Sequence, residues 1–111
     1  YLTLQNENYA MPPMPEGARE GILKGLYKFK AGPDGLKHKA QIFGSGSIIR
    51  SALAAQQILA ERYGVSADVW SATNYKQLRN DCLRARRWNM LHPTEPAQKS
   101  YVETLLANEQ G

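Results

Sequence analysis

The fold of this chain is decided by residues 39–72, which read KAQIFGSGSIIRSALAAQQILAERYGVSADVWSA. Apolar and polar residues alternate near both ends of this stretch, and that spacing predicts strands over residues 39–43 and 65–72. Between them, apolar residues recur every 3.6 residues over four turns, which predicts an amphipathic helix that Gly64 ends. The order strand, turn, helix, strand indicates an α/β layer.

The predicted helix has one apolar face. That face consists of Ile48, Ala52, Ala55, Leu59 and Tyr63. A second helix is expected after the last strand, because Asn74 is a favoured capping residue and Gln77 lies three residues beyond it. The apolar stripe of this second helix consists of Tyr75, Leu78, Cys82 and Ala85. Cys82 is therefore expected to pack as a small hydrophobic residue.

The first third of the chain predicts another helix, after a proline-rich linker over residues 11–15. Its apolar stripe is narrow and consists of Ala18, Ile22 and Leu26. Glycines at positions 17, 21 and 25 also recur every four residues. This spacing indicates either the close approach of another backbone or a loose, partly irregular segment.

A strand over residues 27–31 is expected next, because Tyr27 and Phe29 alternate with lysines. Proline and glycine then mark a turn over residues 32–35. This strand is expected to pair with residues 39–43 as a hairpin. The predicted fold class is therefore α/β, a strand-turn-helix-strand-helix layer with a preceding helix and a hairpin.

Composition sets limits on structure and compartment. The chain has 111 residues, 42% of them hydrophobic and 22% charged, which allows one small globular domain. No apolar run approaches the roughly 20 residues of a membrane span. One cysteine excludes an internal disulfide framework and a multi-cysteine zinc site, so a cytoplasmic location is expected. The strand-like residues 1–4 and the apolar residues 101–107 suggest that both ends are cuts through a longer polypeptide.

The net charge of +4 is concentrated in residues 73–91. The basic residues there are Lys76, Arg79, Arg84, Arg86 and Arg87, against the single acid Asp81. A localised basic face of this kind can contact an acidic partner, a phosphate or nucleic acid, and it can also be an ordinary solvated helix face. Trp88 adjoins the arginines, and Trp70 is a second aromatic candidate for stacking on bases.

The turn formed by Gly44, Ser45, Gly46 and Ser47 opens a predicted helix, where free backbone N–H groups could bind an anion. It lacks the third glycine of a dinucleotide fingerprint and the lysine of a phosphate-binding P-loop. The simpler interpretation is a tight turn in which Ser45 or Ser47 caps the helix. No paired carboxylates suggest acid–base catalysis, and neither His38 nor His92 has a metal-ligand partner at suitable spacing.

Several short motifs occur together and carry a family resemblance. They are Asn6-Glu7-Asn8-Tyr9, Met14-Pro15-Glu16-Gly17, Glu20-Gly21-Ile22, Gly25-Leu26-Tyr27-Lys28, Gly44-Ser45-Gly46-Ser47-Ile48, Tyr63-Gly64-Val65 and Arg87-Trp88-Asn89-Met90-Leu91-His92-Pro93. In this order they resemble the homodimeric, bacterial-type, thiamine-diphosphate-dependent pyruvate dehydrogenases. The resemblance runs from about residue 4 to residue 101, and the motif at residues 87–93 is its most specific part.

The resemblance implies the activity and the partners of a parent enzyme. That family decarboxylates pyruvate and reductively acetylates a lipoyl group, using thiamine diphosphate held through Mg²⁺. Residues 1–15 would end the preceding module, and residues 16–111 would begin an incomplete transketolase-like C-terminal module. The family's cofactor ligands and catalytic residues would lie upstream, so no residue here is assigned to catalysis, cofactor or metal. The implied partners are the rest of the subunit, a second subunit and the dihydrolipoyl acetyltransferase component.

These observations leave three hypotheses about the role of the chain. The first is a structural segment of that dehydrogenase, with Arg79, Arg84, Arg86, Arg87 and Trp88 as candidates for a domain or subunit interface. The second is a freestanding α/β module that binds an anion at residues 44–47. The third is a nucleic-acid-binding domain, which the scattered aromatic residues favour least.

Overall fold

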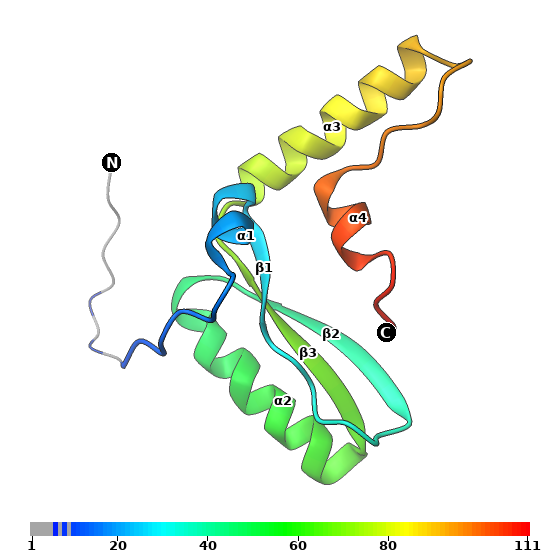
Figure 1. Ribbon diagram of the computed structural model, residues 1–111. Coiled ribbons are helices and arrows are strands. Elements are labelled where there is room, and N and C mark those ends of the chain that lie inside the picture. Colours follow the sequence, from blue (N-terminus) through cyan, green and yellow to red (C-terminus); the bar gives the residue numbers. More distant parts are fainter. Residues whose placement is uncertain (1–5, 7, 9) are drawn as a thin grey trace.

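The computed structural model describes residues 6, 8 and 10–111 (Figure 1). The predicted strand at residues 1–4 lies outside the described part. The elements are α1 (Arg19–Lys24), β1 (Leu26–Lys30), β2 (His38–Gly44), a 3₁₀ turn (Gly46–Ile48), α2 (Ile49–Tyr63), β3 (Val65–Ala72), α3 (Tyr75–Leu91) and α4 (Tyr101–Leu106). This order confirms the α/β prediction and its strand-turn-helix-strand-helix core.

The three strands form one mixed sheet in the order β1-β3-β2. β2 runs parallel to β3, with Ala40 opposite Ala67, and β1 runs antiparallel to β3, with Leu26 opposite Ala72. The predicted hairpin between β1 and β2 is therefore wrong. β3 lies between them because it buries almost its whole length, whereas the lysine-bearing strands are suited to the sheet edges.

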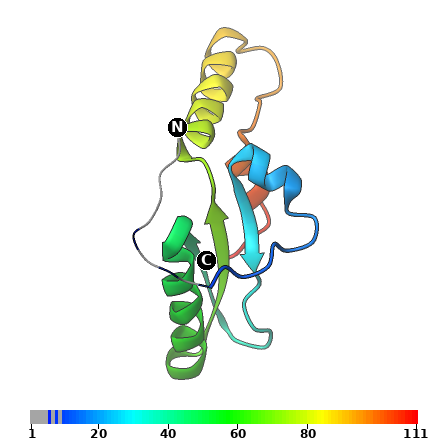
Figure 2. The same cartoon turned by 90° about the vertical axis from the view of Figure 1, so that its left-hand side faces the viewer.

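Helices cover both faces of the sheet. On one face, Ile49 and Ala52 of α2 pack on Val69 of β3. On the other face, Trp70 packs with Leu26, and α4 covers them. The two views show α2 and α4 on opposite sides of the strands, while α3 extends well beyond the end of the sheet (Figures 1 and 2).

The apolar faces of the helices differ in part from the predicted stripes. In α2 the most buried residues are Ile49, Ala52 and Gln56, whereas Ile48 and Tyr63 are exposed. The α-helix begins at Ile49, after the 3₁₀ turn, and Ile49 rather than Ile48 packs on Val69 of β3. Gly64 ends α2 in a left-handed conformation, as predicted.

The helix before β1 is shorter than its stripe predicted, because α1 ends at Lys24 and Leu26 belongs to the sheet. Gly25 causes the break with a φ of +102°, and its carbonyl accepts hydrogen bonds from the backbone N–H groups of Thr73 and Asn74. A Cβ on Gly25 would lie 2.9 Å from the carbonyl oxygen of Asn74. Of the two interpretations of the glycine spacing, close backbone approach is the one seen at this position.

We expect Gly25→Ala to destabilise the chain more than Gly35→Ala. Both glycines have a positive φ, which costs an alanine about 1–2 kcal/mol, but a Cβ on Gly35 would meet open space. The extra cost at Gly25 comes from displacing the backbone that starts α3. Urea unfolding followed by circular dichroism measures the difference, and equal midpoints for the two variants would contradict this account.

Candidate functional site

The motif at residues 87–93 turns the chain back on itself after α3. The side chain of Asn89 forms two hydrogen bonds with the backbone of Gln98, at 2.7 and 3.0 Å. At the end of the helix, the His92 ring stacks on Trp88 with 4.4 Å between ring centroids, and its Nδ1 lies 2.9 Å from the Trp88 carbonyl oxygen. The segment that follows is thereby held alongside α3.

α4 begins at a capping box that sequence reasoning missed. Ser100 Oγ accepts a hydrogen bond from the backbone N–H of Glu103, and the Glu103 carboxylate accepts one from the backbone N–H of Ser100. The Glu103 carboxylate accepts from the backbone N–H of Ser100 and from its hydroxyl, and these two hydrogen bonds hold the pKa of Glu103 below its ordinary value of 4.5. The spacing Ser-x-x-Glu is the signal that could have revealed it. Asp81 of α3 secures the same helix start by accepting from the backbone N–H of Tyr101 at 2.6 Å.

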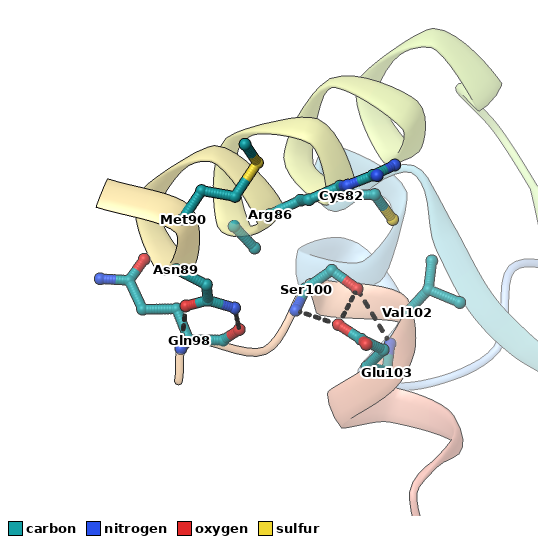
Figure 3. A pocket seen from close by; sticks show the side chains of 9 residues that line it. Cys82, Arg86, Asn89, Met90, Gln98, Ser100, Val102 and Glu103 are labelled. Carbon is teal, nitrogen blue, oxygen red and sulfur yellow. Dashed lines mark hydrogen bonds between the residues drawn. The ribbon is translucent and has the colours of Figure 1, made fainter. Parts of the chain in front are cut away.

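A groove of about 620 Å³ lies between α3 and the start of α4 (Figure 3). Its lining residues come from these two elements and from the segment that joins them. They are Cys82, Ala85, Arg86, Asn89, Met90, Gln98, Ser100, Val102 and Glu103. The lining is mainly apolar, and the Asn89–Gln98 and Ser100–Glu103 hydrogen bonds close one side of it.

The predicted basic face is present and exposed on α3. Arg79, Arg84, Arg86 and Arg87 are all exposed, and Arg84 also donates from Nη2 to Asp81 Oδ1 at 2.6 Å. Trp88 is half-buried against His92. Of the five predicted interface residues, Arg86 alone lines the groove.

Two sequence predictions about single residues need correction. Cys82 is exposed at the groove rather than packed, and Tyr75 is exposed as well. Both lie on a stripe that loses its contact with the sheet, because α3 projects beyond the strands and only Leu78 and Ala85 of that helix are buried. Trp70 lies in β3 and is 1% exposed, so its position in the core fits the strand pattern rather than a role in stacking on nucleic-acid bases.

The turn at residues 44–47 joins β2 to the 3₁₀ turn. Gly44 is buried, and a Cβ there would lie 3.3 Å from Ile49, so close packing of strand and helix explains this glycine. The expected tight turn is present, and Ser45 takes the capping position of the 3₁₀ turn, but its side chain forms no capping hydrogen bond and Ile48 is the residue that precedes α2. Ser45 and Gly46 line a cleft of about 500 Å³, and the anion site there stays a prediction.

A polar cluster on the α4 side of the sheet was not found from the sequence. Lys28 Nζ lies 2.8 Å from Asp68 Oδ2 and 2.7 Å from Glu109 Oε1, and it sits 4.9 Å from the centre of the Trp70 ring. Asp68 Oδ1 also accepts a hydrogen bond from the backbone N–H of Gly32 at 2.7 Å. Asp68 and Glu109 lie 40 and 81 residues from Lys28 in the sequence, so no local sequence pattern predicts the cluster.

The neighbouring groups shift the pKa values of Asp68 and Lys28 in this cluster. Burial alone would raise the pKa of Asp68, but hydrogen bonds from Lys28 and Gly32 outweigh it, so the pKa is lowered from its ordinary value of 3.8. Burial opposes the charge of Lys28 as well, yet its two carboxylate partners raise its pKa above 10.5. Asp68 and Lys28 are therefore both charged at neutral pH, and the cluster fastens the end of the chain to the sheet.

Comparison with known proteins places the fold. Residues 25–111 match the transketolase-like TK C-terminal domain. The chain belongs to this family of transketolase-like C-terminal domains. It is 43% identical over all its residues to the pyruvate dehydrogenase E1 component of Pseudomonas aeruginosa, and 49% identical over 96% of them to that of Escherichia coli K12. It spans only 12–13% of the length of these relatives.

This transketolase-like C-terminal domain does not present the donors of a Mg²⁺–diphosphate site in its described residues. No group of three or more His, Cys, Asp or Glu side chains among them could hold a metal ion. Every buried side-chain nitrogen and oxygen of the described part has a hydrogen-bond partner. No helix formed by the described residues is long and apolar enough to cross a lipid bilayer.

We expect the stability of the chain to fall as the pH drops below about 4, and Asp68→Asn to weaken this dependence. A carboxyl group whose pKa is lowered on folding stabilises the fold above its unfolded pKa, and the contribution is lost as the pH falls through the folded pKa. Urea midpoints measured from pH 7 to pH 3 test this expectation. Asp34→Asn, in an exposed turn, is the matched control, and the same slope in both variants would contradict it.

Proposed function

We propose that this chain is a structural segment of a thiamine-diphosphate-dependent pyruvate dehydrogenase. The observation that carries the proposal is the 43–49% identity to pyruvate dehydrogenase E1 components over nearly the whole chain. The parent enzyme would decarboxylate pyruvate and reductively acetylate a lipoyl group in the cytoplasm. Its partners would be a second identical subunit and a dihydrolipoyl acetyltransferase component.

The role of this segment would be to brace the parent subunit. Two of its motifs serve packing: the motif at residues 87–93 reverses the chain, and Gly44 lets α2 approach the sheet closely. Thiamine diphosphate and Mg²⁺ would be held by residues outside this segment, because its described residues lack a suitable donor cluster. α3, which buries only Leu78 and Ala85 of its 17 residues, would form a domain or subunit contact.

The first test compares the isolated chain with the parent enzyme. We expect the 111-residue chain, supplied with thiamine diphosphate, Mg²⁺ and pyruvate, to release no carbon dioxide above the rate without protein. The parent subunit should release carbon dioxide and acetylate a lipoyl domain under the same conditions. Turnover by the isolated chain, or none by the parent subunit, would refute the proposed function.

The second test concerns the interface role of α3. We expect the double variant Arg86→Glu/Arg87→Glu of the parent enzyme to lose roughly tenfold in dimer affinity or turnover, because two exposed cations become anions at a contact surface. Lys30→Glu/Lys37→Glu changes the charge equally at exposed positions away from α3 and is the control. Wild-type sedimentation and turnover in the α3 variant would reject the interface role.

A further inference from the structure

The groove between α3 and α4 has a mainly apolar lining with one cation, Arg86, and further exposed cations lie along the same helix and form a basic rim beside it. We infer that this groove binds an acidic, amphipathic segment of the same subunit, and that this segment is not among the 111 residues of this sequence. The inference rests on the proposed function in one respect only, namely that the chain is part of a longer subunit. Charge, apolar exposure and the size of the groove carry it.

The charge argument begins with α3. Arg79 and Arg86 lie seven residues apart, so they share one side of the helix, and Lys76 and Arg87 lie next to that side. None of these four cations forms a salt bridge with a described acidic residue. The carboxylates of α3 and of the first turn of α4 are already engaged: Asp81 binds Arg84 and the backbone of Tyr101, and Glu103 binds Ser100. The rim therefore favours an acidic occupant.

The apolar argument concerns the side chains beside those cations. Met90 lines the groove and is 73% exposed, and Leu83, on the adjacent part of the helix, is 46% exposed. Val102 and Ala85 also line the groove. Apolar residues next to cations match a segment that carries apolar side chains flanked by Asp or Glu. A purely polar acidic chain would leave this apolar surface in water.

The size of the groove favours an occupant from the same subunit. Nine residues line it, whereas a stable interface between separate proteins uses roughly 20–30 residues on each side. Exposed ion pairs add little affinity, so a free partner would not be held by this groove alone. A segment of the same polypeptide is present at a high effective concentration and pays a smaller entropic cost. The relatives are about eight times longer than this chain, which leaves ample polypeptide to supply it.

A second copy of this segment is a poorer occupant. Its described carboxylates are either paired within the chain, as Glu20 is with Lys24 and Asp68 with Lys28, or separated on different elements. Asp34 lies in the turn after β1, Glu61 lies on α2, and Glu95 follows α3. The described surface thus offers no acidic cluster that would complement the rim.

The test uses Cys82, whose thiol is exposed in this segment and lines the groove, as a reporter in the full-length subunit. We expect Cys82 to react with N-ethylmaleimide at least tenfold more slowly in the native subunit than in urea, because the occupant covers it. Arg79→Glu/Arg86→Glu should raise the native rate about tenfold by repelling the occupant. Lys30→Glu/Lys37→Glu, with the same charge change elsewhere, should leave the rate unchanged. Mass spectrometry of the peptide containing Cys82 measures each rate.

A second measurement keeps the inference testable if the charge-reversed variant fails to fold. A photo-crosslinking amino acid placed at Met90 of the otherwise native subunit should couple to a peptide rich in Asp and Glu, and the product should migrate as a single subunit. A product of twice the subunit mass, or a crosslinked peptide without acidic residues, would overturn the inference. So would native Cys82 that reacts as fast as in urea, or a folded Arg79→Glu/Arg86→Glu variant that reacts no faster.

The alkylation and crosslinking readouts do not depend on turnover. A parent subunit that failed to decarboxylate pyruvate would refute the proposed function and leave the groove result intact. A fully active subunit in which Cys82 reacts as fast as in urea would refute only the inference that the groove between α3 and α4 binds an acidic segment.

Discussion

The structure depends on β3 being buried on both faces. Its eight residues pair with β2 on one edge and β1 on the other, and helices cover both sides. Val69 contributes to the core under α2, and Trp70 contributes to the core under α4. Because alternate side chains of a strand point to opposite faces, one short apolar strand can organise two cores. The two edge strands and both covering helices are positioned by contact with it.

Two sets of polar contacts join the strands and helices where the side chains between them are polar rather than apolar. The Lys28–Asp68–Glu109 cluster joins β1, β3 and the end of the chain over the Trp70 ring. Gln56 of α2 donates hydrogen bonds to the carbonyl oxygens of Ala31 and Ala67, which ties the loop after β1 to the central strand. Both sets of contacts pair groups that would otherwise be costly to bury, so they define how the layers fit together.

The motif at residues 87–93 has a structural explanation in this chain. Asn89, Trp88 and His92 end α3 and hold the returning segment against it, and α4 then begins at its capping box. Here each of these side chains is engaged by the backbone or by a neighbouring ring, which is what a chain reversal requires.

The sequence alone determined the class of the fold, the bounds of β3, the cap at Asn74 and the end of α2, because these depend on local periodicity and on local backbone geometry. It also located the basic face, since residues 73–91 form one helix and their charges can be counted. The order of the strands, the exposure of Cys82 and the Lys28 cluster were decided only in the tertiary structure. Each depends on contacts between residues that lie far apart in the sequence. The exposure of Cys82 follows from the extension of α3 beyond the sheet, and the local sequence gives no signal of that extension.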